Sequence, residues 1–76
     1  MSFSPPGERV RYIRTEIAKK SQAGFARLLN VSQSSLANIE LGRNMPGFLF
    51  CHLLHTSYAI NLNWLFTGEG GVLVSL

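Results

Sequence analysis

The side chains with the most specific chemistry lie together near the middle of the chain. Gln33 and Asn38 carry amides that can donate and accept hydrogen bonds at once, and Ser34 carries a hydroxyl. A side-chain amide can bind adenine through two hydrogen bonds, and Ala37 could contact a thymine methyl group. Because this set contains no Asp or Glu, it could approach DNA phosphates without charge repulsion. These residue types therefore favour reading of base edges in double-stranded DNA, provided that one surface presents them together.

A second set of reactive side chains lies further along the chain, at Cys51, His52 and His55. Two histidines three residues apart share one side of a helix, a pattern that a metal site or a small metal-dependent hydrolase could use. No carboxylate stands nearby in the sequence to orient or activate them, and Cys51 falls on the apolar stripe of the same helix. We therefore expect these residues to belong to the core or to an interface. We expect no catalytic residues, no metal, no cofactor and no small-molecule substrate.

The composition limits the chain to one small domain. It has 76 residues, of which 46% are hydrophobic and 14% charged, and its net charge is +3. A basic balance admits an anionic partner such as nucleic acid without proving one. The single cysteine excludes an internal disulfide and fits a reducing cytosol. The sequence has neither a signal peptide nor an apolar run of about 18 residues, so we expect a cytoplasmic protein without membrane contact.

Hydrophobic periodicity predicts the helices that position these side chains. A proline pair at residues 5–6 opens the first helix, which carries the apolar stripe Val10, Ile13 and Ile17 and should end near Lys20. Two shorter helices are expected to follow. Their predicted N-caps and terminators are, in chain order, Ser21, Asn30, Ser32 and Gly42.

The second half of the chain is more apolar. We expect a fourth helix over residues 47–58 and a fifth over residues 62–66, around Trp64. The inward stripe of the fourth helix is predicted to be Phe48, Cys51, His55 and Tyr58, and its exposed apolar side Leu49, Phe50 and Leu53. Residues 67–71 are typical of a flexible stop, and the apolar stub after them has no obvious place in a helical bundle. This divides the chain into a domain at 1–70 and an apolar tail at 71–76.

Residues 29–32 join the second and third predicted helices. This connection is too short for antiparallel packing, so the two helices must cross steeply, as in a helix-turn-helix. The second helix of such a pair lies on the surface and fits the major groove of B-DNA. The predicted geometry would thus present the polar side chains of residues 33–38 on one accessible face.

Residues 21–43, SQAGFARLLNVSQSSLANIELGR, resemble the helix-turn-helix of the lambdoid phage repressor and Cro family. Residues 60–70, INLNWLFTGEG, look like the closing element of phage repressor DNA-binding domains, so the similarity covers roughly residues 8–70. The resemblance implies an all-α fold, a compact five-helix bundle of the lambda-repressor type. It also implies a sequence-specific transcriptional regulator, a repressor that binds a palindromic operator in double-stranded DNA.

The resemblance further assigns roles to individual residues. Base reading would fall to Gln33, Ser34, Ala37 and Asn38, and contact with the DNA backbone to Gln22, Ser32, Ser35, Arg43 and Asn44. Arg14 would pair with Glu40 and tie the first helix to the third. Two departures from the family pattern stand out: the loop at 17–20 is one residue longer than usual, and Gly24 replaces an acidic residue that would complete a capping box. The remaining cations of the first helix and loop are expected on a solvated face, namely Arg9, Arg11, Lys19 and Lys20.

The apolar surplus of the second half suggests a protein partner. Exposed apolar patches usually mark contact surfaces, and the family binds its operators as dimers. We therefore hypothesise a homodimer whose interface consists of Leu49, Phe50, Leu53, Leu62, Val72, Leu73 and Val74. The alternative is a protein-interaction module of antitoxin or anti-repressor type in which DNA binding is secondary.

Overall fold

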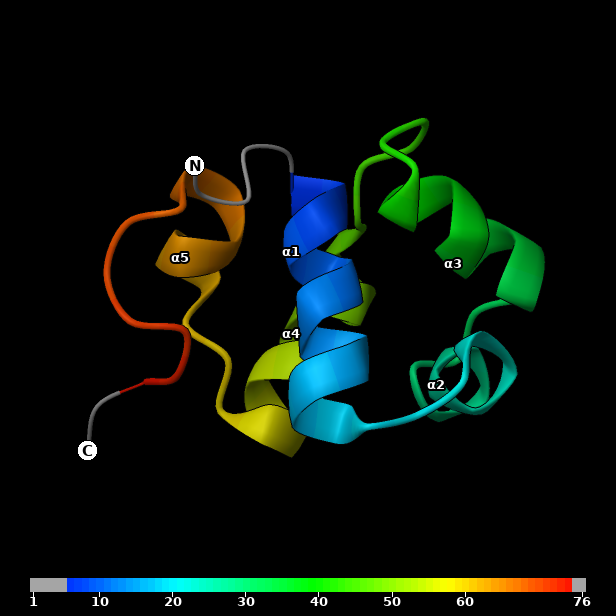
Figure 1. Cartoon of the computed structure of the whole chain (residues 1–76), viewed down its shortest axis with the longest axis horizontal. Coiled ribbons are helices and arrows are strands. Elements are labelled where there is room, and N and C mark those ends of the chain that lie inside the picture. The colour runs from blue at the N-terminus through cyan, green and yellow to red at the C-terminus, as the bar shows by residue number, and fades with distance from the viewer. Residues whose placement is uncertain (1–5, 75–76) are drawn as a thin grey trace.

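The computed structural model describes residues 6–74, which form helical segments joined by short turns (Figure 1). α1 (Pro6–Tyr12) continues without a break into a π-helix, η1 (Ile13–Ala18). The hydrogen bonds of a π-helix span five residues instead of four, so its turn takes up extra chain. The loop predicted at 17–20 is therefore partly helical, because residues 17 and 18 belong to η1. The helix ends at Ala18, where Lys19 adopts the left-handed conformation with φ 55°.

α2 (Gln22–Leu28) and α3 (Gln33–Glu40) follow as a helix-turn-helix. The predicted N-caps are confirmed, because each hydroxyl accepts a backbone N–H of its first turn, at 3.1 Å for Ser21 and 3.0 Å for Ser32. Asn30 is left-handed with φ 65°, as its place after α2 predicts. The sequence therefore defines both ends of the turn locally.

α4 (Phe48–Tyr58) and α5 (Leu62–Thr67) complete the bundle. α1 lies in the middle with α4 behind it, α2 and α3 on one side, and α5 on the other (Figure 1). α1 packs against both α3 and α5. It therefore joins the helix-turn-helix to α5.

The core draws on every helix and on the turn between α4 and α5. Trp64 is buried there, as predicted, and its ring meets that of Tyr12 edge to face at 6.1 Å between centroids. The largest fully buried side chains are Val10, Ile13, Phe25, Leu29, Leu36, Leu54, Ile60 and Leu65.

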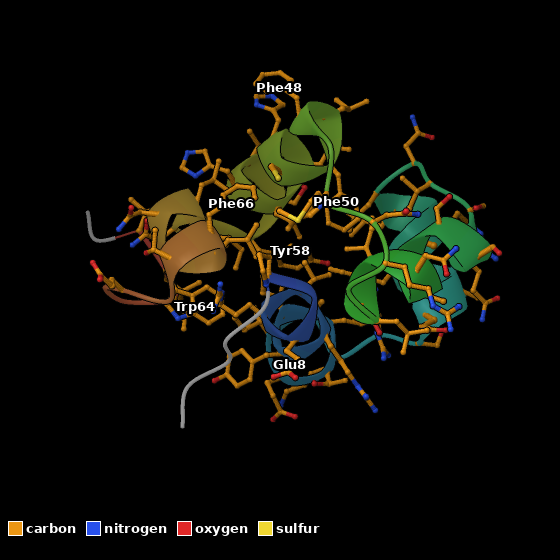
Figure 2. The ribbon with its side chains drawn as sticks, turned by 90° about the horizontal axis from the view of Figure 1, so that it is seen from above. Glu8, Phe48, Phe50, Tyr58, Trp64 and Phe66 are labelled. Carbon is orange, nitrogen blue, oxygen red and sulfur yellow. The ribbon has the colours of Figure 1, made fainter. Side chains whose placement is uncertain are left out.

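The predicted orientation of α4 is confirmed for the inward Cys51 and the exposed Leu49 but wrong for three other residues, Phe48, Phe50 and His55. Phe50, expected on the exposed side, is buried with 4% of its surface accessible, whereas Phe48, expected inside, is 87% exposed. Figure 2 shows Phe48 projecting away from the bundle and Phe50 turned toward its centre. Cys51 and Leu54 complete the buried side, and His55 is exposed instead. The cause is that the prediction placed His55 on the inward stripe, although His52, His55 and Thr56 fall on one polar side of α4 and Phe48 lies on that same side.

The apolar tail has a place in the fold after all. Ile60 and Leu73 form an isolated antiparallel bridge. The N–H of Asn61 donates to the carbonyl of Val72 at 2.8 Å, and the N–H of Val74 donates to the carbonyl of Ala59 at 2.7 Å. The described part of the tail therefore lies back against the turn between α4 and α5. Residues 75 and 76, which belong to the predicted tail, lie outside the described residues.

Arg9 is buried, contrary to the solvated face that we predicted for it. Only 2% of its surface is accessible, and its Nε donates to the carbonyl of Leu65 at 2.6 Å. This carbonyl lies near the C-terminal end of α5, where a cation also complements the helix dipole. Arg9 therefore ties α1 to α5.

The first turn of α1 also meets the last turn of α3, and almost no space separates the two backbones. A Cβ atom on Gly7 would collide with the carbonyl oxygen of Ile39 and lie 2.9 Å from that of Glu40. Glycine at this position is what lets the two helices approach so closely. No helix within residues 6–74 has the length and apolar character needed to cross a membrane.

Candidate nucleic-acid interface

The four predicted base-reading residues lie on one side of α3. With about 100° between successive residues, Gln33, Ser34, Ala37 and Asn38 fall within one sector, and Leu36 occupies the buried sector opposite. Gln33 and Ser34 are exposed, whereas Ala37 and Asn38 are half-buried. The structure thus brings the four together as a polar face, with its most accessible groups at the N-terminal end of α3.

The predicted backbone contacts fall into two groups. Ser32 and Ser35 lie at the start of α3, where Oγ of Ser32 also bonds to Oγ of Ser35 at 2.9 Å. Arg43 and Asn44 are exposed in the turn after α3, and their N–H groups donate to the carbonyl of Asn38 at 2.9 and 3.3 Å. The two ends of the polar face are therefore each flanked by hydrogen-bond donors.

Gln22, the fifth predicted backbone contact, is engaged within the protein. It is the first residue of α2 and half-buried, and its Nε2 donates to Oε1 of Glu40 at 3.1 Å. Sequence reasoning missed this bond. The two residues are 18 positions apart, and nothing local in the sequence indicates that they meet.

Arg14 and Glu40 form the ion pair that the family resemblance implied. Nε of Arg14 lies 2.7 Å from Oε2 of Glu40, and its Nη2 lies 3.2 Å from Oε1. The side chains are only 13% and 4% exposed, respectively. A two-point guanidinium–carboxylate contact restricts both distance and orientation. It therefore holds the C-terminal end of α3 at a defined place on η1.

The carboxylate of Glu40 is the point where three helical segments meet. It accepts hydrogen bonds from Arg14 of η1 and from Gln22 of α2 while it belongs to the last turn of α3. We call Arg14, Gln22 and Glu40 the carboxylate clasp. The clasp and the close approach at Gly7 together set how α3 is presented.

The second set of reactive side chains is dispersed. Burial raises the pKa of the Cys51 thiol, because the charged thiolate is disfavoured away from water. The ring of His52 stacks on that of Phe48 with centroids 6.1 Å apart, and Nδ1 of His55 lies 3.0 Å from the carbonyl of Ile60. Among the described residues, no three His, Cys, Asp or Glu side chains are grouped so that they could hold a metal ion.

The fold is similar to that of a known repressor. One similar structure is the P22 c2 repressor in complex with the synthetic operator 9T, with a TM-score of 0.76, 23% identity, and coverage of 87% of this chain and 98% of that one. A second is the solution structure of the DNA-binding domain of the P22 c2 repressor, with a TM-score of 0.74, 22% identity, and coverage of 97% of this chain and 100% of that one. No curated protein matches the chain.

The sequence itself also matches a protein family, independently of these structures. The match covers residues 7–71, from the second residue of α1 to beyond the end of α5, and includes the bridge residue Ile60. The predicted all-α fold and its helix-turn-helix are thereby confirmed. The chain belongs to the helix-turn-helix domain family.

Proposed function

We propose that this protein is a sequence-specific transcriptional regulator of double-stranded DNA, a repressor of phage or prophage type. The observation that carries this proposal is the polar face of α3. Gln33, Ser34, Ala37 and Asn38 share one side of a helix whose other side is anchored in the core. Phosphate contacts would supply most of the affinity, and this face would supply the discrimination between sequences.

Several features of the chain support the proposal. Its net charge is +3, and Arg43 is exposed next to the polar face. The P22 c2 repressor, which has this fold, is known in complex with a synthetic operator. Repression would follow from occupation of a promoter, with no catalytic step. We place this activity in the cytoplasm of a bacterial host.

Alanine at Gln33 or Asn38 is expected to weaken binding by about 1–3 kcal/mol at one base pair and to relax specificity there. A preferred DNA duplex is first obtained by in-vitro selection from a random pool. The affinities of the wild type and of each protein variant are then measured for this duplex and for duplexes that differ from it by one base pair. Asn63→Ala is the matched control, because Asn63 is exposed on α5, across the molecule from α3 (Figure 1). Equal weakening of selected and random duplexes by the α3 variants would contradict the assignment.

We further propose that the regulator acts as a homodimer on a palindromic operator. Phe50 is removed from the hypothesised interface because it lies in the core, and Phe48 takes its place as an exposed side chain. Leu49 and Leu73 are also exposed. The half-buried members of the proposed interface are Leu53, Leu62, Val72 and Val74.

Sedimentation equilibrium should show this dimer, with a monomer–dimer midpoint that Phe48→Ser shifts to higher concentration by about tenfold. The reason is that an 87% exposed phenylalanine would be covered in the dimer. Thr56→Ser is a suitable control, because Thr56 is exposed on the same helix and carries little apolar surface. A monomer at high micromolar concentration, both alone and on the selected duplex, would exclude the homodimer.

The exposed aromatic pair of Phe48 and His52 also supports the second candidate, a protein-interaction module of antitoxin or anti-repressor type. The selection experiment separates the two candidates. Enrichment of a palindromic duplex supports the regulator, whereas a pool that remains random after repeated rounds supports the interaction module.

A further inference from the structure

The carboxylate clasp contains a side chain whose orientation determines what it can offer to a ligand. A glutamine amide has a donor end, the NH₂ group, and an acceptor end, the carbonyl oxygen. In Gln22 the donor end faces Glu40, with Nε2 at 3.1 Å from Oε1. The reversed amide would place its oxygen against a carboxylate oxygen, which is a repulsive contact. Glu40 therefore selects one of the two amide orientations.

This selection leaves one donor available. The Nε2 atom of Gln22 carries two hydrogens, and the bond to Glu40 uses one of them. Gln22 is half-buried, and no group within residues 6–74 accepts a hydrogen bond from the second hydrogen. The side chain is thus held by the protein through one N–H, and its other N–H is not used for a hydrogen bond within the described residues.

The surroundings make an anion the suitable acceptor for that hydrogen. The carboxylate of Glu40 would repel a phosphate, but only 4% of this side chain is accessible and Arg14 neutralises it at 2.7 Å. Arg43 and Asn44, the proposed backbone contacts, follow Glu40 directly along the chain and are exposed. A DNA strand that passes this end of α3 would therefore meet a fixed neutral donor and not a negative charge.

We propose that Glu40 is a positioning residue for DNA binding, which acts by fixing the Gln22 amide with its free N–H directed to a backbone phosphate. This inference rests on the proposed function. The amide reaches the duplex already oriented, so binding does not have to immobilise it. Because the same carboxylate belongs to the last turn of α3, the phosphate contact and the position of the polar face become linked through one group.

The test measures coupling between Gln22 and individual phosphates. Duplexes enriched by in-vitro selection are synthesised with a single uncharged methylphosphonate at each position in turn, and binding is compared for the wild type and for Gln22→Met, which has a similar length and no donor. In the wild type we expect several phosphates per half-site to be sensitive, and among them one that Gln22 contacts, whose neutralisation lowers affinity about tenfold, the effect of one hydrogen bond to a charged group. In Gln22→Met the same replacement should change affinity by less than about twofold.

The role of Glu40 is then tested by repeating the measurement in Glu40→Gln and Glu40→Asp. The amide at position 40 accepts either orientation of Gln22, and the shorter aspartate draws the carboxylate away from it. We expect the coupling between Gln22 and the phosphate to fall from about tenfold to about threefold or less in each variant that circular dichroism shows to be folded. Glu40→Asp keeps the negative charge opposite Arg14, so the test does not depend on whether Glu40→Gln is stable.

The outcomes distinguish the two levels of the proposal. Coupling that stays at its wild-type value in the Glu40 variants would overturn the positioning role. Gln22→Met could instead lower the affinity to the same extent for every modified duplex. Gln22 would then have only a structural role, and the positioning role would also be overturned. If selection enriches no duplex at all, the proposed function fails, and the positioning role fails with it.

Discussion

Replacement of Gly7 by alanine is expected to destabilise the protein by more than about 3 kcal/mol. In an open helix the same change would add about 1 kcal/mol of stability, because alanine is the better helix former. Here the new Cβ would collide with the carbonyl oxygen of Ile39 and approach that of Glu40. These are backbone atoms in the last turn of α3, which cannot rotate away as a side chain would. The collision should therefore cost more than the roughly 1–3 kcal/mol that is usual for overpacking.

Urea denaturation followed by circular dichroism measures this change, and Gly24→Ala provides the control. A Cβ on Gly24 would meet only Oγ of Ser21, at 3.3 Å, and Ser21 is exposed and able to shift. We expect Gly24→Ala to stay within about 1 kcal/mol of the wild type. A domain of this size has about 4–11 kcal/mol of stability in total. If Gly7→Ala were as stable as Gly24→Ala, the close approach of α1 to α3 would be refuted.

The second large effect is expected for Glu40→Ala, with a loss of about 3 kcal/mol. The substitution removes the carboxylate from the clasp and leaves the guanidinium of Arg14, whose side chain is only 13% exposed in the wild type, without its charged partner. Breaking a buried ion pair from one side costs about 3–5 kcal/mol, mostly because the remaining charge is poorly hydrated. The lower end of this range applies, since the guanidinium also donates to the carbonyl of Lys20 at 3.1 Å.

Two further variants determine whether the uncompensated charge is the cause. Glu69→Ala removes an exposed carboxylate far from the clasp and should change stability by less than about 0.5 kcal/mol. The double variant Arg14→Met with Glu40→Ala removes both charges, so it should be more stable than Glu40→Ala alone. Thermal and urea unfolding of the four proteins give the comparison. A double variant less stable than the single one would contradict the argument.

The helix-turn-helix was predictable because its signals are local. Ser21 and Ser32 cap their helices through atoms only three residues away, and Asn30 needs nothing beyond its own backbone preference. The residues of α3 that share a face follow from the helical period alone. The identity of the base-reading residues remains a prediction, because it concerns contacts with DNA.

The features that escaped prediction depend on partners distant in sequence. Burial of Arg9 requires the carbonyl of Leu65, and no pattern near Arg9 indicates it. The orientation of α4 is an exception, because His52, His55 and Thr56 mark its exposed side, which also carries Phe48, in the sequence itself. The π-helical turn of η1 also escaped prediction, because intrinsic propensity does not favour this rare geometry.

The bond between Arg9 and Leu65 also bears on how the molecule opens and closes as a unit. It joins residues 56 positions apart and brings α1 against α5. Neither helix can therefore fray without exposing the guanidinium of Arg9 and the carbonyl of Leu65, which are buried together. Amide hydrogens in α1 and α5 should accordingly exchange with solvent through one shared opening, at a common free energy. α3 is therefore held in a domain in which α1 and α5 stabilise each other, although the signals that define the helix-turn-helix are local.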